Sequence, residues 1–133
     1  MKQKIENLIP MAFRAVEDKL ATNGQVSRQY NGYIASFGAS VVQSGMMAAL
    51  VFNHRAESRS ERDRKALMDA IFEVIKSMEK RTINENRLLD YYKTRLVDKR
   101  MLKLNIMDAA AAIKLVIRTF KLVEESTVRD NTN

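Results

Sequence analysis

Apolar residues recur every three or four positions along most of the chain, which is the spacing of an α-helix. One clear stripe consists of Leu67, Ile71, Val74, Ile75 and Met78. Another stripe, nearer the C-terminus, consists of Ile106, Ala110, Ile113, Ile117 and Phe120. No segment of useful length alternates apolar and polar residues as a strand would. The pattern predicts an all-α fold, a compact bundle of five to six helices in a single domain.

Turn signals divide these stripes into separate helices. A first stripe, between Ile5 and Leu20, is followed by Thr22-Asn23-Gly24, which predicts a helix end. Pro10 either kinks this first helix or lies in its first turn. Ser60 is typical of a helix start. We expect the helical domain to span residues 1–125, with residues 126–133 as a flexible tail because they are mostly polar.

The segment between Tyr30 and Phe52 contains no charged residue. A window of about 20 apolar residues can span a bilayer, but this segment contains many serine, glycine and amide residues. We therefore predict no membrane span and a helix buried at the centre of a bundle. Gly38 and Gly45 lie seven positions apart, so in an unbroken helix they share one face and permit close packing. Alternatively, Gly45 breaks the segment into two helices.

Charge gives a first indication of the partner. The 133 residues carry 23 Lys and Arg against 16 Asp and Glu, for a net charge of +7. Such an excess favours a polyanionic partner, nucleic acid before anionic membrane, although it also serves as a solubilising surface charge. Cysteine is absent, which excludes disulfides and thiolate chemistry and fits a cytoplasmic location.

The sequence lacks the residues of a recognisable catalytic site. His54 is the one histidine, and it lies in a polar connection where we expect a solvated side chain. The glycines do not form a phosphate-binding loop after a strand. The acidic residues near the middle alternate with basic ones, as on a solvated helix surface. We therefore expect no enzyme, no cofactor, no metal and no small-molecule substrate.

The positive charge is concentrated in the C-terminal third, where residues 87–133 hold ten basic and six acidic side chains. Lys114, Arg118 and Lys121 recur at i, i+4 and i+7, which predicts a row along one side of a helix. An upstream cluster consists of Lys93, Arg95, Lys99, Arg100 and Lys103. Such rows suit the phosphates of RNA, which they would follow without reading the bases, although an ordinary solvated surface has the same pattern.

Four tyrosines allow two interpretations. Tyr30, Tyr33, Tyr91 and Tyr92 are of a type that stacks on nucleic-acid bases. In a helical protein a tyrosine more often packs its ring in the core and hydrogen-bonds its hydroxyl.

The central segment, from Tyr33 to Phe52, resembles the signature of the small subunit of the Cmr-type, or type III-B, CRISPR effector complex. In that family a tyrosine-led helix reaches a Gln/Asn-x-Gly-Leu-like step followed by an Ala-Leu-x-Phe run. The step here is Gln43-Ser44-Gly45-Met46, and the run is Ala49-Leu50-Val51-Phe52. Length, helical organisation and a basic last helix are also similar.

The resemblance implies a non-catalytic, all-helical subunit of a ribonucleoprotein that acts in antiviral defence. Copies of the subunit would stack beside the crRNA, contact other Cmr-type subunits and help to hold the target RNA. The motif residues expected in the core or in subunit contacts are Tyr33, Gly38, Gln43, Gly45, Met46, Leu50 and Phe52. One alternative is a helical protein–protein adaptor with no direct RNA contact. A helical transcription regulator is a weaker alternative, since no short helix-turn-helix unit is recognisable.

Overall fold

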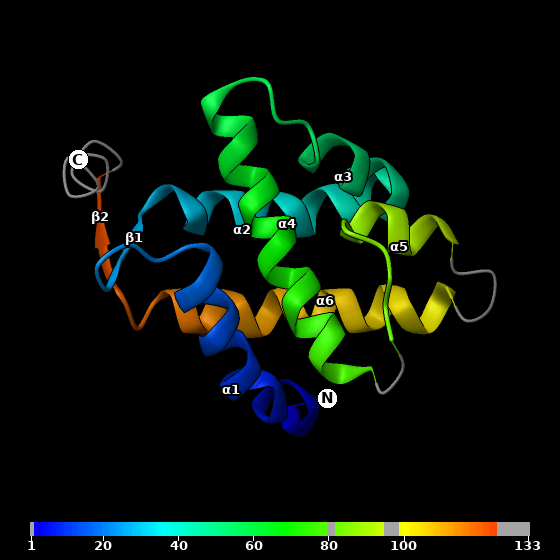
Figure 1. Cartoon of the computed structure of the whole chain (residues 1–133), viewed down its shortest axis with the longest axis horizontal. Coiled ribbons are helices and arrows are strands. Elements are labelled where there is room, and N and C mark those ends of the chain that lie inside the picture. Colours follow the sequence, from blue (N-terminus) through cyan, green and yellow to red (C-terminus); the bar gives the residue numbers. More distant parts are fainter. Residues whose placement is uncertain (1, 80–81, 95–98, 125–133) are drawn as a thin grey trace.

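The computed structural model describes residues 2–79, 82–94 and 99–124. Within these ranges the chain forms six helices and two short strands (Figure 1). The helices are α1 (Lys2–Lys19), α2 (Gln29–Ser44), α3 (Met46–Asn53), α4 (Arg59–Met78), α5 (Leu88–Thr94) and α6 (Lys99–Ile117). The strands are β1 (Gln25–Ser27) and β2 (Lys121–Val123). The prediction of a single all-α domain with five to six helices is confirmed.

Helix α4 forms the centre of the packing. It crosses α2 and α6 in Figure 1 and also contacts α1, α3 and α5. Its apolar stripe is buried, with Leu67, Ile71 and Ile75 almost inaccessible to solvent. Each such side chain contributes about 1.5–3 kcal/mol of burial free energy. The two stripes that the sequence indicated, on α4 and α6, therefore meet in one core.

Helix α4 begins with a capping box. The Oγ of Ser58 accepts a hydrogen bond from the backbone N–H of Glu61 at 3.2 Å, and the Glu61 carboxylate accepts one from the N–H of Ser58 at 2.9 Å. The sequence placed this start at Ser60, two residues too late. Both bonds satisfy N–H groups that a helix start otherwise leaves without partners.

The predicted end of the first helix is confirmed. Helix α1 ends at Lys19, and the backbone then turns through Asn23 and Gly24, whose φ angles are 54° and 75°. Pro10 lies inside α1, not in its first turn.

A small parallel sheet joins distant parts of the chain. Strand β1 pairs with β2 so that Gln25, Val26 and Ser27 face Lys121, Leu122 and Val123. The sequence did not predict these strands. Three residues are too few to show an alternating pattern, and their pairing depends on contacts made across the whole fold.

Helix α6 ends earlier than the apolar stripe predicted. The N–H and the Oγ1 of Thr119 both donate to the carbonyl oxygen of Val116, at 2.9 and 2.8 Å, and the chain leaves the helix after Ile117. Phe120 therefore lies beyond the helix, where its ring packs 6.2 Å from the ring of Phe13. The prediction of a helix through Phe120 is wrong at its end.

The break at Gly45 separates α2 from α3. Its φ of 93° and ψ of 161° belong to a region that is almost restricted to glycine. The predicted break is therefore confirmed. The predicted close packing is wrong, because a Cβ added at Gly38 or Gly45 would meet no atom within 4 Å. Gly38 instead lines an open groove of about 280 Å³ between α2 and α6.

The uncharged segment is buried on one side only. Ile34, Phe37 and Val41 face the core, whereas Val42 is 82% exposed and Phe52 is 46% exposed. The prediction of a wholly buried helix is therefore wrong. In the described part of the chain, no helix combines the length and the apolar character that crossing a membrane requires.

Candidate functional site

The basic residues of the C-terminal third form two separate groups at opposite ends of α6. One group lies at the start of α6 and the other at its end. Lys99 and Lys114 are about 22 Å apart along the helix axis, given a rise of about 1.5 Å per residue. We call these sets the start group (Lys93, Lys99, Arg100 and Lys103) and the end group (Lys114, Arg118 and Lys121).

The start group combines the end of α5 with the first turns of α6. Lys93, Arg100 and Lys103 are exposed, and Lys99 is half-buried. The Lys99 Nζ lies 5.3 Å from the centroid of the Tyr92 ring, a cation–π arrangement that restrains this lysine. Arg95, which we predicted to belong with these residues, lies outside the described residues.

The end group does not form the helical row that its spacing predicted. Lys114 is on α6, Arg118 is in the turn that follows, and Lys121 is in β2. The prediction is wrong because α6 ends at Ile117, so the i, i+4, i+7 relation does not extend to Lys121. Pairing of β2 with β1 instead places Lys121 opposite Gln25.

The same pairing brings an arginine that the sequence did not single out close to the end group. Arg28 follows β1, and its backbone N–H donates to the carbonyl oxygen of Val123 at 2.8 Å. Its guanidinium forms an ion pair with the carboxylate of Glu124, with 3.4 Å between Nε and Oε1. Both side chains are exposed, so the pair contributes at most about 1 kcal/mol.

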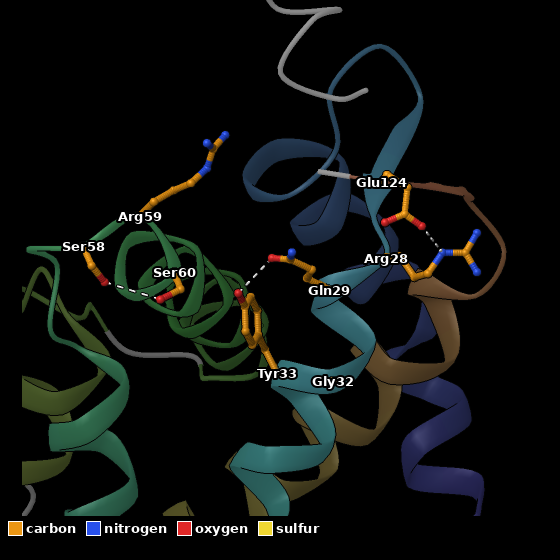
Figure 2. A pocket seen from close by; sticks show the side chains of 8 residues that line it. All are labelled: Arg28, Gln29, Gly32, Tyr33, Ser58, Arg59, Ser60 and Glu124. Carbon is orange, nitrogen blue, oxygen red and sulfur yellow. Dashed lines mark hydrogen bonds and ion pairs between the residues drawn. The ribbon is translucent and has the colours of Figure 1, made fainter. Parts of the chain in front are cut away.

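A cleft of about 760 Å³ opens beside Arg28, between the N-terminal ends of α2 and α4 (Figure 2). It is lined by Arg28, Gln29, Gly32, Tyr33, Ser58, Arg59, Ser60 and Glu124. Figure 2 shows Tyr33 and Gln29 on the side of α2 that faces α4, and Arg59 extending from the start of α4. Two arginines and one glutamate give the lining a net positive charge.

Tyr33 is held in place by contacts on several sides. Its hydroxyl donates to Gln29 Oε1 at 3.0 Å, and the ring of Tyr30 meets it edge-on at a centroid distance of 6.0 Å. The Arg64 guanidinium carbon lies 5.4 Å from the centroid of the Tyr33 ring and 5.0 Å from that of Phe52. Tyr33 of α2 and Phe52 of α3 are thereby linked through one cation from α4.

The motif residues divide between the core and the surface. Met46 and Leu50 are buried in the core. Gln43 and Phe52 are exposed, and the remaining three are half-buried. The contiguous motif therefore supplies packing from some positions and accessible surface from others.

His54 is a structural residue at the junction of α3 and α5. The prediction of a solvated side chain is wrong, because His54 is only 6% exposed. Its Nδ1 lies 2.6 Å from the carbonyl oxygen of Leu50, and the N–H of Leu89 donates to its Nε2 at 3.4 Å. The carbonyl only accepts and the amide only donates, so the neutral ring must carry its proton on Nδ1. Desolvation lowers the pKa of His54 below its ordinary value.

The described residues contain no group of three or more His, Cys, Asp or Glu side chains that would suit a metal ion. The ring nitrogens of His54 are both engaged by backbone groups. The candidate sites on the protein surface are therefore the two basic groups, the cleft and the exposed apolar side chains of α2 and α3.

Comparison with known proteins identifies a family. The family model described as CRISPR-associated protein (Cas_Cmr5) matches residues 6–114. The matched range runs from α1 to Lys114 and includes the central motif, whereas Arg118 and Lys121 follow it. No curated protein and no solved structure matches the chain.

Proposed function

The chain belongs to the Cas_Cmr5 family of CRISPR-associated proteins, and we propose that it is the non-catalytic small subunit of a type III-B ribonucleoprotein effector. Membership implies association with other subunits of the Cmr complex. Within that complex, copies of this chain would stack along the crRNA and help to bind target RNA in antiviral defence. We also propose a cytoplasmic location, where such a complex would meet its RNA.

The family match is the observation that carries this proposal. The two basic groups support the RNA contact, since five of their seven side chains are exposed. Long basic side chains neutralise phosphates without reading base identity, as a subunit that serves many different target sequences must do.

The experiment is a charge reversal in the reconstituted effector complex. Changing Lys114, Arg118 and Lys121 together to glutamate should weaken target-RNA binding. Loss of three phosphate contacts should also reduce the slope of log affinity against log salt by about 2, at roughly 0.7 per contact for a single strand.

A matched control reverses three basic residues outside both groups, Arg14, Lys19 and Lys76. The control complex should keep the affinity and the salt dependence of the unmodified one. If the end-group variant also keeps both, the end group does not contact RNA.

The adaptor function is the second candidate, and the exposed apolar side chains of Val42, Val51 and Phe52 favour it. Exposed apolar side chains that adjoin one another are typical of a protein contact, and Val51 and Phe52 are neighbours in α3. Omitting the subunit from the complex distinguishes the two functions: RNA affinity falls if the subunit binds RNA, and stays unchanged if it only joins proteins. Sequencing of RNA recovered with the tagged protein from its native cell gives an independent test, since an effector subunit should recover short RNAs with a repeat-derived 5′ tag.

A further inference from the structure

We propose that the cleft between α2 and α4 binds one nucleotide of a single-stranded RNA, with the base against Tyr33 and the phosphate near Arg59. The inference deepens the proposed function and rests on it only in taking RNA as the ligand. It assigns an RNA contact to residues outside both basic groups.

The size of the cleft suits a nucleotide. Its volume of about 760 Å³ lies within the usual range of small-ligand sites, roughly 300–1,000 Å³. It is formed mainly by the N-terminal ends of two helices that contact each other, and its lining residues are exposed or half-buried. A site built on such elements needs little ordering when the ligand binds.

Tyr33 provides a positioned aromatic ring. The hydrogen bond to Gln29, the edge contact with Tyr30 and the Arg64 cation fix its orientation, and it lies on the side of α2 that faces α4 (Figure 2). Tyr33 is half-buried, and stacking of a base on the accessible part of its ring tolerates every base, because each has a π-face. A subunit that follows RNA of any sequence needs a contact of this kind.

The opposite wall supplies groups that suit a phosphate and a ribose. Arg59 adds a cation at the rim, and the hydroxyls of Ser58 and Ser60 lie 3.4 Å apart at the first turn of α4. The Glu61 carboxylate already caps this start of α4, so Arg59 supplies the positive charge of this wall. Hydroxyl and amide groups at this wall and on Gln29 are suited to the 2′-hydroxyl, which distinguishes RNA from DNA.

The cleft adjoins the end group. Arg28 is bonded through its backbone to Val123, two residues after Lys121, and Glu124 follows as part of the lining. An RNA strand seated in the cleft would therefore continue over Lys121 and Arg118. The carboxylate of Glu124 opposes a phosphate, but its ion pair with Arg28 is exposed and easily exchanged.

The experiment is a titration of the full chain, labelled with ¹⁵N, with a short single-stranded oligouridine, followed by amide chemical shifts. This measurement detects binding even at millimolar dissociation constants. We expect the largest shifts at Gly32, Tyr33, Arg59 and Ser60. Shifts confined to the start and end groups would overturn the inference and leave the proposed RNA contact intact. No shift at any residue up to millimolar RNA would also overturn it, while the charge reversal in the complex would still test the proposed function.

Paired variants make the test specific. Tyr33→Leu should weaken binding about tenfold through loss of base stacking, and Tyr33→Phe should bind like the unmodified chain. Phe52→Leu is the matched control, since Phe52 also lies beneath the Arg64 cation but is outside the cleft and outside both basic groups. Equal weakening by Tyr33→Leu and Phe52→Leu would refute the cleft as the site.

Charge variants provide a second, independent comparison. Arg59→Gln should weaken binding several-fold more than Arg62→Gln, an equal charge change one turn further along α4. Glu124→Gln removes the opposing carboxylate and should tighten binding. If oligouridine leaves the cleft residues unaffected and only an added Cmr subunit shifts them, the cleft is a protein contact and the inference fails.

Discussion

Lowering the pH below about 6.5 should destabilise the fold through His54, the one histidine of the chain, because the unfolded chain takes up its proton first. A proton added at Nε2 would face the N–H of Leu89, so two hydrogen-bond donors would point at each other. The imidazolium would also carry a charge that is almost inaccessible to water. Lys65 and Arg87 oppose this charge and Asp69 favours it. Desolvation is the largest effect, and it lowers the pKa of His54 in the folded state.

The sign follows from that lowered pKa. Above the ordinary value of 6.5, His54 is neutral in both states and the free energy of unfolding is at its full value. As the pH falls below 6.5, the unfolded chain gains the proton first, and stability falls until the pH passes the folded pKa. One proton changes the free energy of unfolding by at most about 1.4 kcal/mol per pH unit.

Urea unfolding followed by circular dichroism at several pH values measures this slope. The variant His54→Gln should be less stable, by about 1–3 kcal/mol if a backbone partner is left unsatisfied, and its stability should not change over the same pH range. Hydrogen bonds from Arg87 lower the pKa of Asp90, so the contribution of Asp90 to the stability of the fold is lost only at lower pH, where carboxyl groups titrate. The assigned role of His54 would be refuted if the free energy of unfolding of His54→Gln still changed with pH, or if that of the unmodified chain did not.

Three further predictions concern the helix boundaries and the exposed apolar surface. Ser58→Ala should cost about 1 kcal/mol through loss of the α4 cap, seen as a lower melting temperature in calorimetry; an unchanged temperature would contradict the role of the capping box. Gly45→Ala should cost about 1–3 kcal/mol because of the positive φ, whereas Gly38→Ala should be neutral or stabilising by up to about 1 kcal/mol; chemical denaturation compares the two, and equal costs would refute the distinction. Val42→Asp should change the free energy of unfolding by no more than about 0.5 kcal/mol, yet reduce incorporation into the complex, measured by co-purification. Full incorporation would exclude the surface around Val42 as a subunit contact.

The sequence predicted those parts of the fold that depend on local spacing. The α4 and α6 stripes were recognisable because a helix places every third or fourth residue on one side, whatever it packs against. The break at Gly45 and the turn at Gly24 were recognisable for a similar reason, since glycine marks backbone that other residues avoid.

The parts that were missed depend on contacts between distant residues. Lys121 has helical spacing from Lys114, and only the pairing of β2 with β1 shows that it lies in a strand. His54 belongs to a polar stretch, and its burial comes from α5, more than thirty residues later. Arg28 and Arg59 were overlooked as site residues because one stands alone just before the uncharged segment and the other lies among alternating charges.

The contact between the two ends of the chain has a consequence for folding during synthesis. Helix α1 packs along α6, with Lys4 bonded to Asn105 at 2.6 Å and paired with Asp108 at 3.1 Å, and β1 pairs with β2. The first helix to leave the ribosome can therefore pack against α4 midway through synthesis, but the rest of its apolar side has no partner until α6 has been made. Pairings of such long sequence separation slow folding, and the waiting apolar surface is prone to aggregation. Nascent chains that stop before α6 should accordingly depend on chaperones, and completion of α6 should be the step at which the domain becomes resistant to proteolysis.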